Sequence, residues 1–405
     1  NIYGPLATYV AEAFYLLGAG YVGAVKIVFA LSVVASGLAM YGFVKRVMGR
    51  RAALVASVAY MVIPYRLVDI YVRAALAESV AYVFVPLVLW GVWATLYRPR
   101  LANVLGLALA YAALMFTSPL VALLLTLILV FYIAALALAR INDRQPLRKL
   151  SRESLLPLLG HLGYVLFPTA LGLILGVCLS AVFALPAMTE NRFVRVDQWY
   201  GGRYAWGRDF VEFFQLFSPR WGFGASVPGP DDDVSFQLGA VAVVLSLFAL
   251  IPLFSKKARA ALGRPAVRLI LFFAGLTAVI LFLMLGISAP VWQALSLAQL
   301  AQFPWRLLTF TVVSMAFLCG AAAMGARPAK GLVDLSTLIL VALLILGSLP
   351  YVKAELSEQE VSIANLMRFQ QSADEMTGST AWVKEIPTWS SMADYHIAGE
   401  PVTSK

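Results

Sequence analysis

Ten runs of apolar residues recur along this chain between residues 22 and 350, most of them near membrane-spanning length. A spanning helix needs about 20 such residues, and it satisfies its own backbone hydrogen bonds inside lipid. The apolar–polar alternation of a membrane barrel is absent from the sequence. We therefore expect an all-α polytopic membrane protein, with spans near 22–44, 52–65, 79–97, 101–116, 119–139, 160–187, 238–255, 268–287, 307–326 and 333–350.

Composition supports this fold class, because only 13% of the residues are charged, against about 25% in ordinary soluble domains. Residues 4–18 predict one more helix, which either spans the membrane or lies at its outer surface, so we expect ten to eleven helices. The run over 52–65 reaches only about 20 Å of an apolar core roughly 30 Å thick. That helix is expected to tilt, or to continue through the charged stretch that follows it.

Positive charge gathers in five short gaps between the apolar runs. These gaps hold 18 of the 31 lysines and arginines but only 3 of the 21 acidic residues. Short loops rich in lysine and arginine mark the cytoplasmic side of a membrane protein. The net charge of +10 is thus a topology signal, and no nucleic-acid partner is predicted. The gaps are residues 45–51, 98–100, 140–153, 256–268 and 327–334.

The other gaps carry most of the polar variety, and we expect them on the extracytoplasmic side of the cytoplasmic membrane. Residues 1–350 form the predicted transmembrane domain, whose largest outer loop is 189–237. Residues 351–405 predict an amphipathic helix followed by extended chain, typical of the start of an outer soluble segment. Because the sequence starts at Asn1 without a signal-peptide pattern, we expect a piece of a longer protein.

Residues 64–79 carry four charges, Arg66, Asp69, Arg73 and Glu78, between two strongly apolar runs. Four lipid-exposed charges at the bilayer centre would cost roughly 10 kcal/mol, so they must pair, lie at the interface or line a wet cavity. On one continuous helix, Arg66, Asp69 and Arg73 share a face and Glu78 points elsewhere. The stretch is then either an interfacial turn with an Asp–Arg pair or the polar wall of a substrate cavity. In the second interpretation Arg73 binds phosphate, Asp69 orients it, and Glu78 is the acid or base.

Arginines and aromatic residues alternate in the stretch 186–210, which opens the predicted outer loop. Arg192 and Arg195 lie near its start, and Arg306 lies where a later outer segment re-enters the membrane. The guanidinium fork binds phosphate with two hydrogen bonds, so these three arginines are candidate contacts of a lipid phosphate. An aromatic belt with solvated ion pairs, and an arginine that snorkels beside a belt tryptophan, explain the same residues without a ligand.

The sequence does not identify a cofactor. The two histidines, His161 and His396, are far apart in different kinds of segment, and both cysteines lie in apolar runs, which argues against a zinc or haem site. No P-loop, Rossmann glycine pattern or Ser-His-Asp order is present. A divalent cation near the three aspartates of 231–233 stays open as an alternative.

Five stretches in order along the chain resemble the bacterial and archaeal membrane proteins called 6-pyruvoyl-tetrahydropterin synthase-related. They are YGPLATYVAEAFYLLG, the string PYRLVDIYVRAALAES with the apolar run before it, SAVFALPAMTENRFV, FPWRLLTF and TGSTAWVKEIP. The resemblance covers most of the chain and implies a branch of the GT-C glycosyltransferase superfamily. Such enzymes are polytopic helical proteins that move a sugar from a polyprenyl-phosphate carrier to an acceptor outside the cytoplasm. In that family an acidic residue of the first outer loop, before the helix that starts here at Tyr3, acts as base or metal ligand.

Two functions follow as hypotheses. The first is a membrane glycosyltransferase that uses a lipid-linked sugar, with Glu78 and Asp69 as catalytic residues and Arg73, Arg192, Arg195 and Arg306 at phosphate. The second is a noncatalytic subunit or scaffold of a larger membrane complex, whose partners are other subunits and the lipid bilayer. A transporter is a third option, which the gathering of charge on one side rather than at mid-membrane does not favour.

Overall fold

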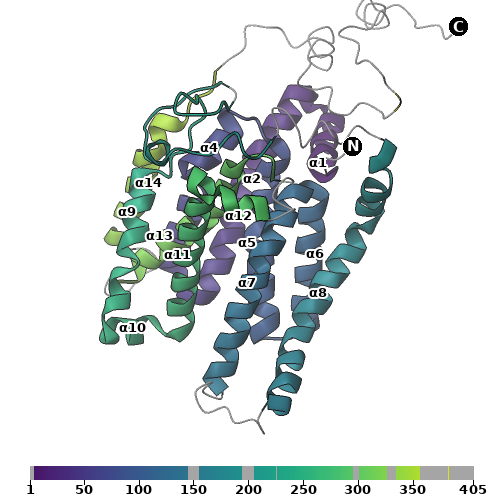
Figure 1. Ribbon diagram of the computed structural model, residues 1–405. Coiled ribbons are helices and arrows are strands. Elements are labelled where there is room, and N and C mark those ends of the chain that lie inside the picture. Colours follow the sequence, from purple (N-terminus) through teal and green to yellow (C-terminus); the bar gives the residue numbers. More distant parts are fainter. Residues whose placement is uncertain are drawn as a thin grey trace, which may run out of the picture.

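The structure, a computed structural model, describes residues 4–144, 155–193, 205–224, 226–294, 301–325, 334–355 and 382. Helices make up the regular structure of these residues, which contain no β-strand. Figure 1 shows the long helices packed side by side in one bundle. The expectation of an all-α chain is confirmed.

The helices of the described residues are α1 (Leu6–Phe14), α2 (Gly20–Met48), α3 (Arg50–Val62), α4 (Pro64–Tyr71), α5 (Leu76–Tyr97), α6 (Leu101–Thr117), α7 (Pro119–Arg144), α8 (Leu155–Thr189), α9 (Ala240–Phe248), α10 (Lys256–Leu262), α11 (Arg264–Met284), α12 (Ala289–Ala294), α13 (Leu308–Ala322) and α14 (Leu335–Ser348). Short 3₁₀ turns extend some of them, and three recur below: η4 (Asn191–Phe193), η8 (Ile251–Phe254) and η11 (Pro304–Leu307). The long helices α5, α6, α7 and α8 follow one another in alternating directions along the bundle (Figure 1).

Among the described residues, six helical segments are long and apolar enough to cross a membrane, and the number rises to eight if each of two bent helix pairs is one span. Two shorter apolar helices, Leu101–Thr117 and Leu335–Tyr351, occupy predicted spans. These helices identify a multi-pass membrane protein within the described part of the chain. The predicted ten to eleven crossings require that the bent pairs and the shorter helices also span.

Helix α13 is the centre of the bundle. All of its residues from Leu308 to Ala321 are buried, and it packs against α3, α9 and α11. Gly320 permits the close approach to α3, because a Cβ at this position would lie 2.5 Å from the Ala52 carbonyl oxygen. Small residues at such crossings let helix backbones approach closely in lipid.

Helix α8 lies at the edge of the bundle (Figure 1) and is mostly exposed. A row of large apolar side chains covers its outer surface, as on a helix that faces lipid rather than protein. They include Phe167, Ile174, Val177, Val182, Leu185 and Met188. The apolar side chains of α8 therefore face the bilayer, whereas those of α13 pack against other helices.

The charged stretch begins at a break in the helix that precedes it. Because a proline disfavours helical backbone at the residue before it, Ile63 is extended, with ψ 134°, in front of Pro64. Helices α3 and α4 consequently meet at an angle of 40°. The helical path continues into the charged stretch, as expected for a run too short to span alone, but it ends at Tyr71, before Arg73 and Glu78.

The predicted helix at residues 4–18 is present as α1, which continues directly into a π-helical turn over Tyr15–Ala19. The helical path bends at Gly18 and Gly20, which have φ angles of +93° and +65° that glycine adopts readily. Together α1 and this turn reach about 20 Å, less than an apolar core roughly 30 Å thick. Ala7 of α1 packs against Val28 of α2 and Val80 of α5, which places α1 beside the start of α5.

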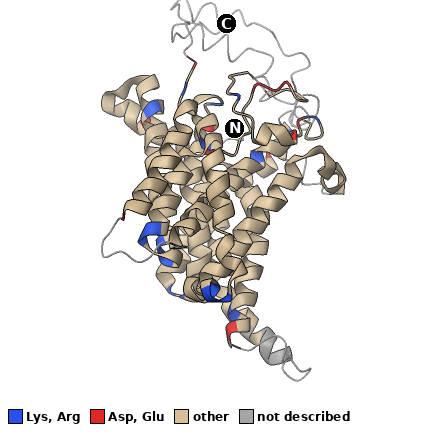
Figure 2. Ribbon diagram, turned by 90° about the vertical axis from the view of Figure 1, so that its left-hand side faces the viewer, with Lys and Arg blue, Asp and Glu red and all other residues tan. Residues whose placement is uncertain are grey.

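Charge divides the bundle into two ends. Figure 2 shows most lysines and arginines gathered at one end, which holds the α2–α3 junction, the α5–α6 connection and α10; we call it the basic end. The other end holds α4, the start of α5 and η11, and we call it the α4 end. This separation has the form that the charge pattern predicts, while the side of the membrane on which each end lies stays a prediction.

Candidate functional site

Arg73 and Glu78 lie on opposite sides of a turn that separates α4 from α5. Within this turn Ala74 has a φ of +48°, which residues other than glycine adopt rarely. The turn brings Glu78, in the first turn of α5, back to Arg73. The expectation that Glu78 points away from the Asp69–Arg73 pair is therefore wrong, because it assumed one continuous helix.

The Arg73 guanidinium is the centre of a charged cluster at the α4 end. Its Nη1 donates hydrogen bonds to Asp69 Oδ1, to Glu78 Oε2 at 2.7 Å and to the Tyr65 hydroxyl at 3.1 Å. Its central carbon lies 4.7 Å from the centre of the Trp305 ring. One cation thus joins two carboxylates, and the ring contact with Trp305 fixes where it lies.

Glu78 also connects α5 to the central helix. The Thr309 hydroxyl, in the first turn of α13, donates to Glu78 Oε1 at 2.5 Å, while Oε2 accepts from Arg73. Both carboxylate oxygens therefore have a partner, each from a different segment of the chain. Thr309 is 1% exposed, so this contact lies inside the bundle.

Arg66 lies deeper and fastens α4 to its neighbours. Its Nη1 donates to Ser79 Oγ at 2.9 Å and its Nη2 donates to Ser32 Oγ at 3.1 Å. Its guanidinium carbon is 4.3 Å from the centre of the Tyr82 ring, a cation–π distance. Arg66 therefore holds α4 against α2 and α5, and no part of its side chain is exposed.

Burial excludes the lipid-facing arrangement of these charges. The Asp69 side chain is fully buried, and the side chains of Arg73 and Glu78 are 16% and 11% exposed. Paired charges inside the protein avoid most of the cost that isolated charges would have in lipid. A substrate cavity beside the cluster stays a prediction.

Two buried nitrogen atoms near the cluster, Arg66 Nε and Trp305 Nε1, have no hydrogen-bond partner within the described residues. Buried polar groups in native proteins are nearly always hydrogen-bonded to protein or to ordered water. These two donors therefore keep hydrogen-bonding capacity beyond the ion pairs of the cluster.

Arg306 borders the cluster from η11. Its Nη1 donates to Gln302 Oε1 at 2.5 Å, and its central carbon lies 5.2 Å from the Phe303 ring centre. The Trp305 ring contacts both arginines, at 4.7 Å from Arg73 and 6.0 Å from Arg306. Gln302 has a φ of +61°, so both segments that bound the cluster contain a residue in the sparsely populated left-handed region.

The other predicted phosphate contacts lie elsewhere. Arg192 is exposed in η4, with its central carbon 4.7 Å from the Phe193 ring centre. Figure 1 shows α8, which leads into η4, on the opposite flank of the bundle from α4. Among the described residues no contact joins Arg192 to the cluster, and Arg195 lies outside those residues. The structure thus brings Asp69, Arg73, Glu78 and Arg306 together, and not Arg192.

Sequence reasoning missed several partners of these charges, among them Thr309, Tyr65 and Ser79. Tyr65 and Ser79 lie inside or beside the charged stretch, so a test for side chains able to pair with its arginines could have found them. Thr309 carries no such signal, because only the packing of α13 against α5 brings it to Glu78.

The described residues contain no group of three or more His, Cys, Asp or Glu side chains able to hold a metal ion. The two carboxylates of the cluster share Arg73, so a divalent cation would have to displace that guanidinium. At the aspartates of 231–233, Asp232 instead holds the loop, because its carboxylate accepts hydrogen bonds from Ser226 Oγ and the amides of Val227 and Val234. At both places these carboxylates already have partners within the protein, and a divalent cation stays a prediction.

Comparison of the chain with models of protein families, with curated proteins and with solved structures finds no match. Function is therefore inferred from the site itself.

Proposed function

We propose that this protein is a membrane glycosyltransferase that moves a sugar from a polyprenyl-phosphate carrier to an acceptor on the extracytoplasmic face of the cytoplasmic membrane. One observation carries the proposal: Glu78 lies 2.7 Å from Arg73 at the α4 end, each keeping a small exposed fraction. A carboxylate beside a fixed cation supplies the two groups that such a transfer needs. The resemblance to GT-C enzymes supports the same function.

The chemistry uses Glu78 as the general base. Its carboxylate takes the proton of an acceptor hydroxyl, and the acceptor oxygen forms a bond with the anomeric carbon as the bond from that carbon to the carrier phosphate breaks. The polyprenyl phosphate leaves with the electron pair of the broken bond. An acceptor hydroxyl would replace the Thr309 hydroxyl as the hydrogen-bond donor to Glu78 Oε1.

The arginines stabilise the leaving phosphate. Arg73 and Arg306 contact the same Trp305 ring, so two cations are held on one aromatic side chain near the base. Fixed cations placed where negative charge develops lower the barrier without reorganisation. Asp69 positions Arg73 from four residues earlier in the chain, through its Oδ1. No step is assigned to a metal ion, since the carboxylates are already joined by Arg73.

The test is sugar transfer in membranes that hold the protein and radiolabelled polyprenyl-phosphate sugars. Glu78→Gln keeps the shape of the side chain, so we expect folded protein and transfer that is reduced about 10²- to 10⁴-fold. Arg306→Lys keeps the charge but loses the fork, so carrier affinity should drop, and kcat should fall as well because the fork is placed at the leaving phosphate. Full transfer by Glu78→Gln would exclude Glu78 as the general base. Absence of transfer by the wild type with every carrier would exclude the glycosyltransferase function.

A noncatalytic membrane subunit is the second candidate, and one observation favours it. Arg73 is engaged by Asp69, Glu78 and Tyr65 at once, so the cluster also works as a clamp that joins α4, α5 and α13. Removing one partner of a buried pair costs about 3–5 kcal/mol, because the remaining charge is left uncompensated. If the cluster is only a clamp, Arg73→Gln lowers the unfolding temperature, and neither the wild type nor any variant transfers sugar.

A further inference from the structure

The chain makes a sharp elbow at the basic end. The helical segment that ends in η8 meets α10 at 112°. Ser255 begins α10 by accepting a hydrogen bond from the Ala258 amide at 3.4 Å, and Gly263, with a φ of +81°, turns the chain into α11. Helix α10 therefore lies across the end of the bundle, as Figure 1 shows.

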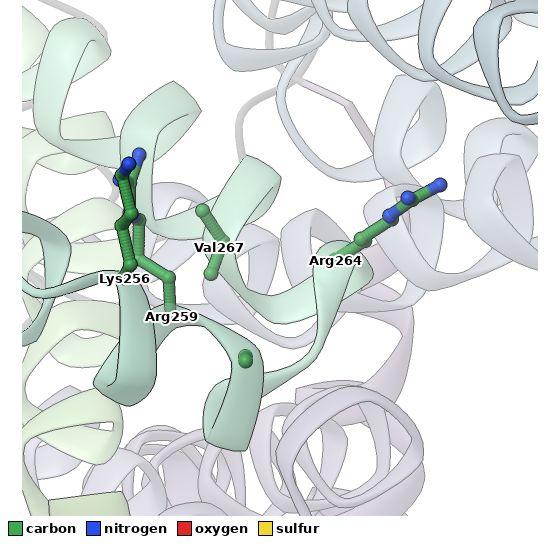
Figure 3. Close-up of a pocket in the computed structure, with 5 residues that line it drawn as sticks. Lys256, Arg259, Arg264 and Val267 are labelled. Atoms are coloured by element: carbon green, nitrogen blue, oxygen red, sulfur yellow. The ribbon is translucent and has the colours of Figure 1, made fainter.

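A hollow of about 330 Å³ lies between α10 and the start of α11. Three of its five lining residues are cations, Lys256, Arg259 and Arg264, and none is acidic. Figure 3 shows Lys256 and Arg259 together on one side of the hollow, and Arg264 extending away on the other side. The lining therefore favours a negatively charged occupant.

The two cations of α10 that line the hollow are available to such an occupant. Arg264 lies 3.4 Å from the carboxylate of Asp143, which also accepts from Arg268 at 2.5 Å. Lys256 and Arg259 are exposed, and within the described residues neither lies within salt-bridge distance of a carboxylate. Their three-residue spacing places both on one face of α10.

Apolar side chains project from the elbow beside these cations. Phe254 is 91% exposed and Ile251 is 58% exposed, both in η8, which Ser255 separates from Lys256. An exposed phenylalanine next to lysines is typical of a segment at the membrane interface, with the ring among acyl chains and the cations at phosphate level. A soluble anion would use only the cations, whereas a phospholipid uses both kinds of side chain.

We propose that this elbow is a binding site for an anionic phospholipid of the adjoining leaflet. Lys256 and Arg259 contact the headgroup phosphate over the hollow, and Phe254 and Ile251 contact the acyl chains. Each cation near an anionic membrane surface strengthens association roughly fivefold. The site is independent of the proposed transferase chemistry, because it lies at the opposite end of the bundle.

The test uses the purified full chain in a zwitterionic detergent, titrated with dioctanoyl-phosphatidylglycerol, dioctanoyl-phosphatidylcholine or sodium phosphate. Binding is followed as a shift of the thermal unfolding midpoint, since a ligand of the folded state stabilises it. We expect a saturable rise with phosphatidylglycerol only. Lys256→Gln/Arg259→Gln should weaken that binding more than tenfold.

A matched control is Arg98→Gln/Arg100→Gln, which removes two exposed cations from the α5–α6 connection at the same end. It should change affinity less than twofold, and Lys256→Arg/Arg259→Lys should retain binding. Equal losses in both glutamine pairs would overturn the proposal in favour of diffuse attraction. Equal stabilisation by sodium phosphate would show a free-anion site, and equal stabilisation by phosphatidylcholine would show apolar contact alone; either result would overturn it.

Discussion

Glu78 and Thr309 are 231 residues apart in the chain, yet the Thr309 hydroxyl donates a hydrogen bond to Glu78 Oε1 at 2.5 Å. The contact joins the start of α5 to the start of α13, the helix with the most complete burial among those described. Because Glu78 also accepts from Arg73, the same carboxylate links the turn after α4 to the centre of the bundle. The charged cluster and the core are therefore one structural unit.

Thr309→Val should test that link without changing the shape of the side chain. Loss of the hydroxyl leaves Glu78 Oε1 without its donor in a buried place, and we expect a destabilisation of about 1–3 kcal/mol. Reversible unfolding in detergent measures it, and Thr309→Ser, which keeps a hydroxyl, is the matched control. If valine and serine variants unfold at the same midpoint, the hydrogen bond contributes nothing.

Gly320→Ala should disturb the crossing of α13 and α3. The added Cβ would lie 2.5 Å from the Ala52 carbonyl oxygen and 2.8 Å from the Ala56 Cβ, so the helices must separate. Overpacking of this kind costs typically about 1–3 kcal/mol. Gly106→Ala on α6 is the control, because no atom lies within 4 Å of a Cβ there. Equal unfolding midpoints for the two variants would contradict the close approach.

Asp334, which precedes α14, should give a pH-dependent contribution to stability. Its carboxylate accepts hydrogen bonds from the Thr337 hydroxyl and amide and pairs with Arg51 at 3.0 Å, which together lower its pKa to about 2. A lowered folded-state pKa gives stability that is present above the ordinary value near 4 and lost as the pH falls toward 2. The midpoint difference between wild type and Asp334→Asn should therefore shrink between pH 4 and pH 2. A difference that stays constant over this range would contradict the assignment.

The topology is tested with single cysteines at exposed positions of the two ends. In a Cys178→Ser background, Asp231→Cys should react with an impermeant thiol reagent in intact cells, and Lys257→Cys should react only after lysis. The reason is the gathering of lysine and arginine at the basic end, which the positive-inside rule places in the cytoplasm. The reverse labelling pattern would invert the map and place the charged cluster on the cytoplasmic side.

The sequence alone determined the features that depend on local composition. Apolar runs predict the membrane helices, the gaps rich in lysine and arginine predict one basic end, and Pro64 accounts for the break before α4. The pairing of Asp69 with Arg73 also followed from their spacing of four residues, although Arg73 lies just after the end of α4. In each case the decisive interactions are between residues close together in the sequence, or between one segment and the lipid or water around it.

Only the tertiary structure decided how the charges are arranged. The left-handed conformation of Ala74 turns Glu78 toward Arg73, whereas periodicity on an unbroken helix sends it elsewhere. Trp305 is the sequence neighbour of Arg306, so their contact is local. Its contact with Arg73, which is distant in the sequence, exists only because the fold brings η11 beside the turn after α4. Arg192 is separated from them because α8 lies on another flank of the bundle (Figure 1). Such contacts depend on which helices become neighbours, and in an apolar chain many pairings of helices bury similar surfaces, so hydropathy alone does not select among them.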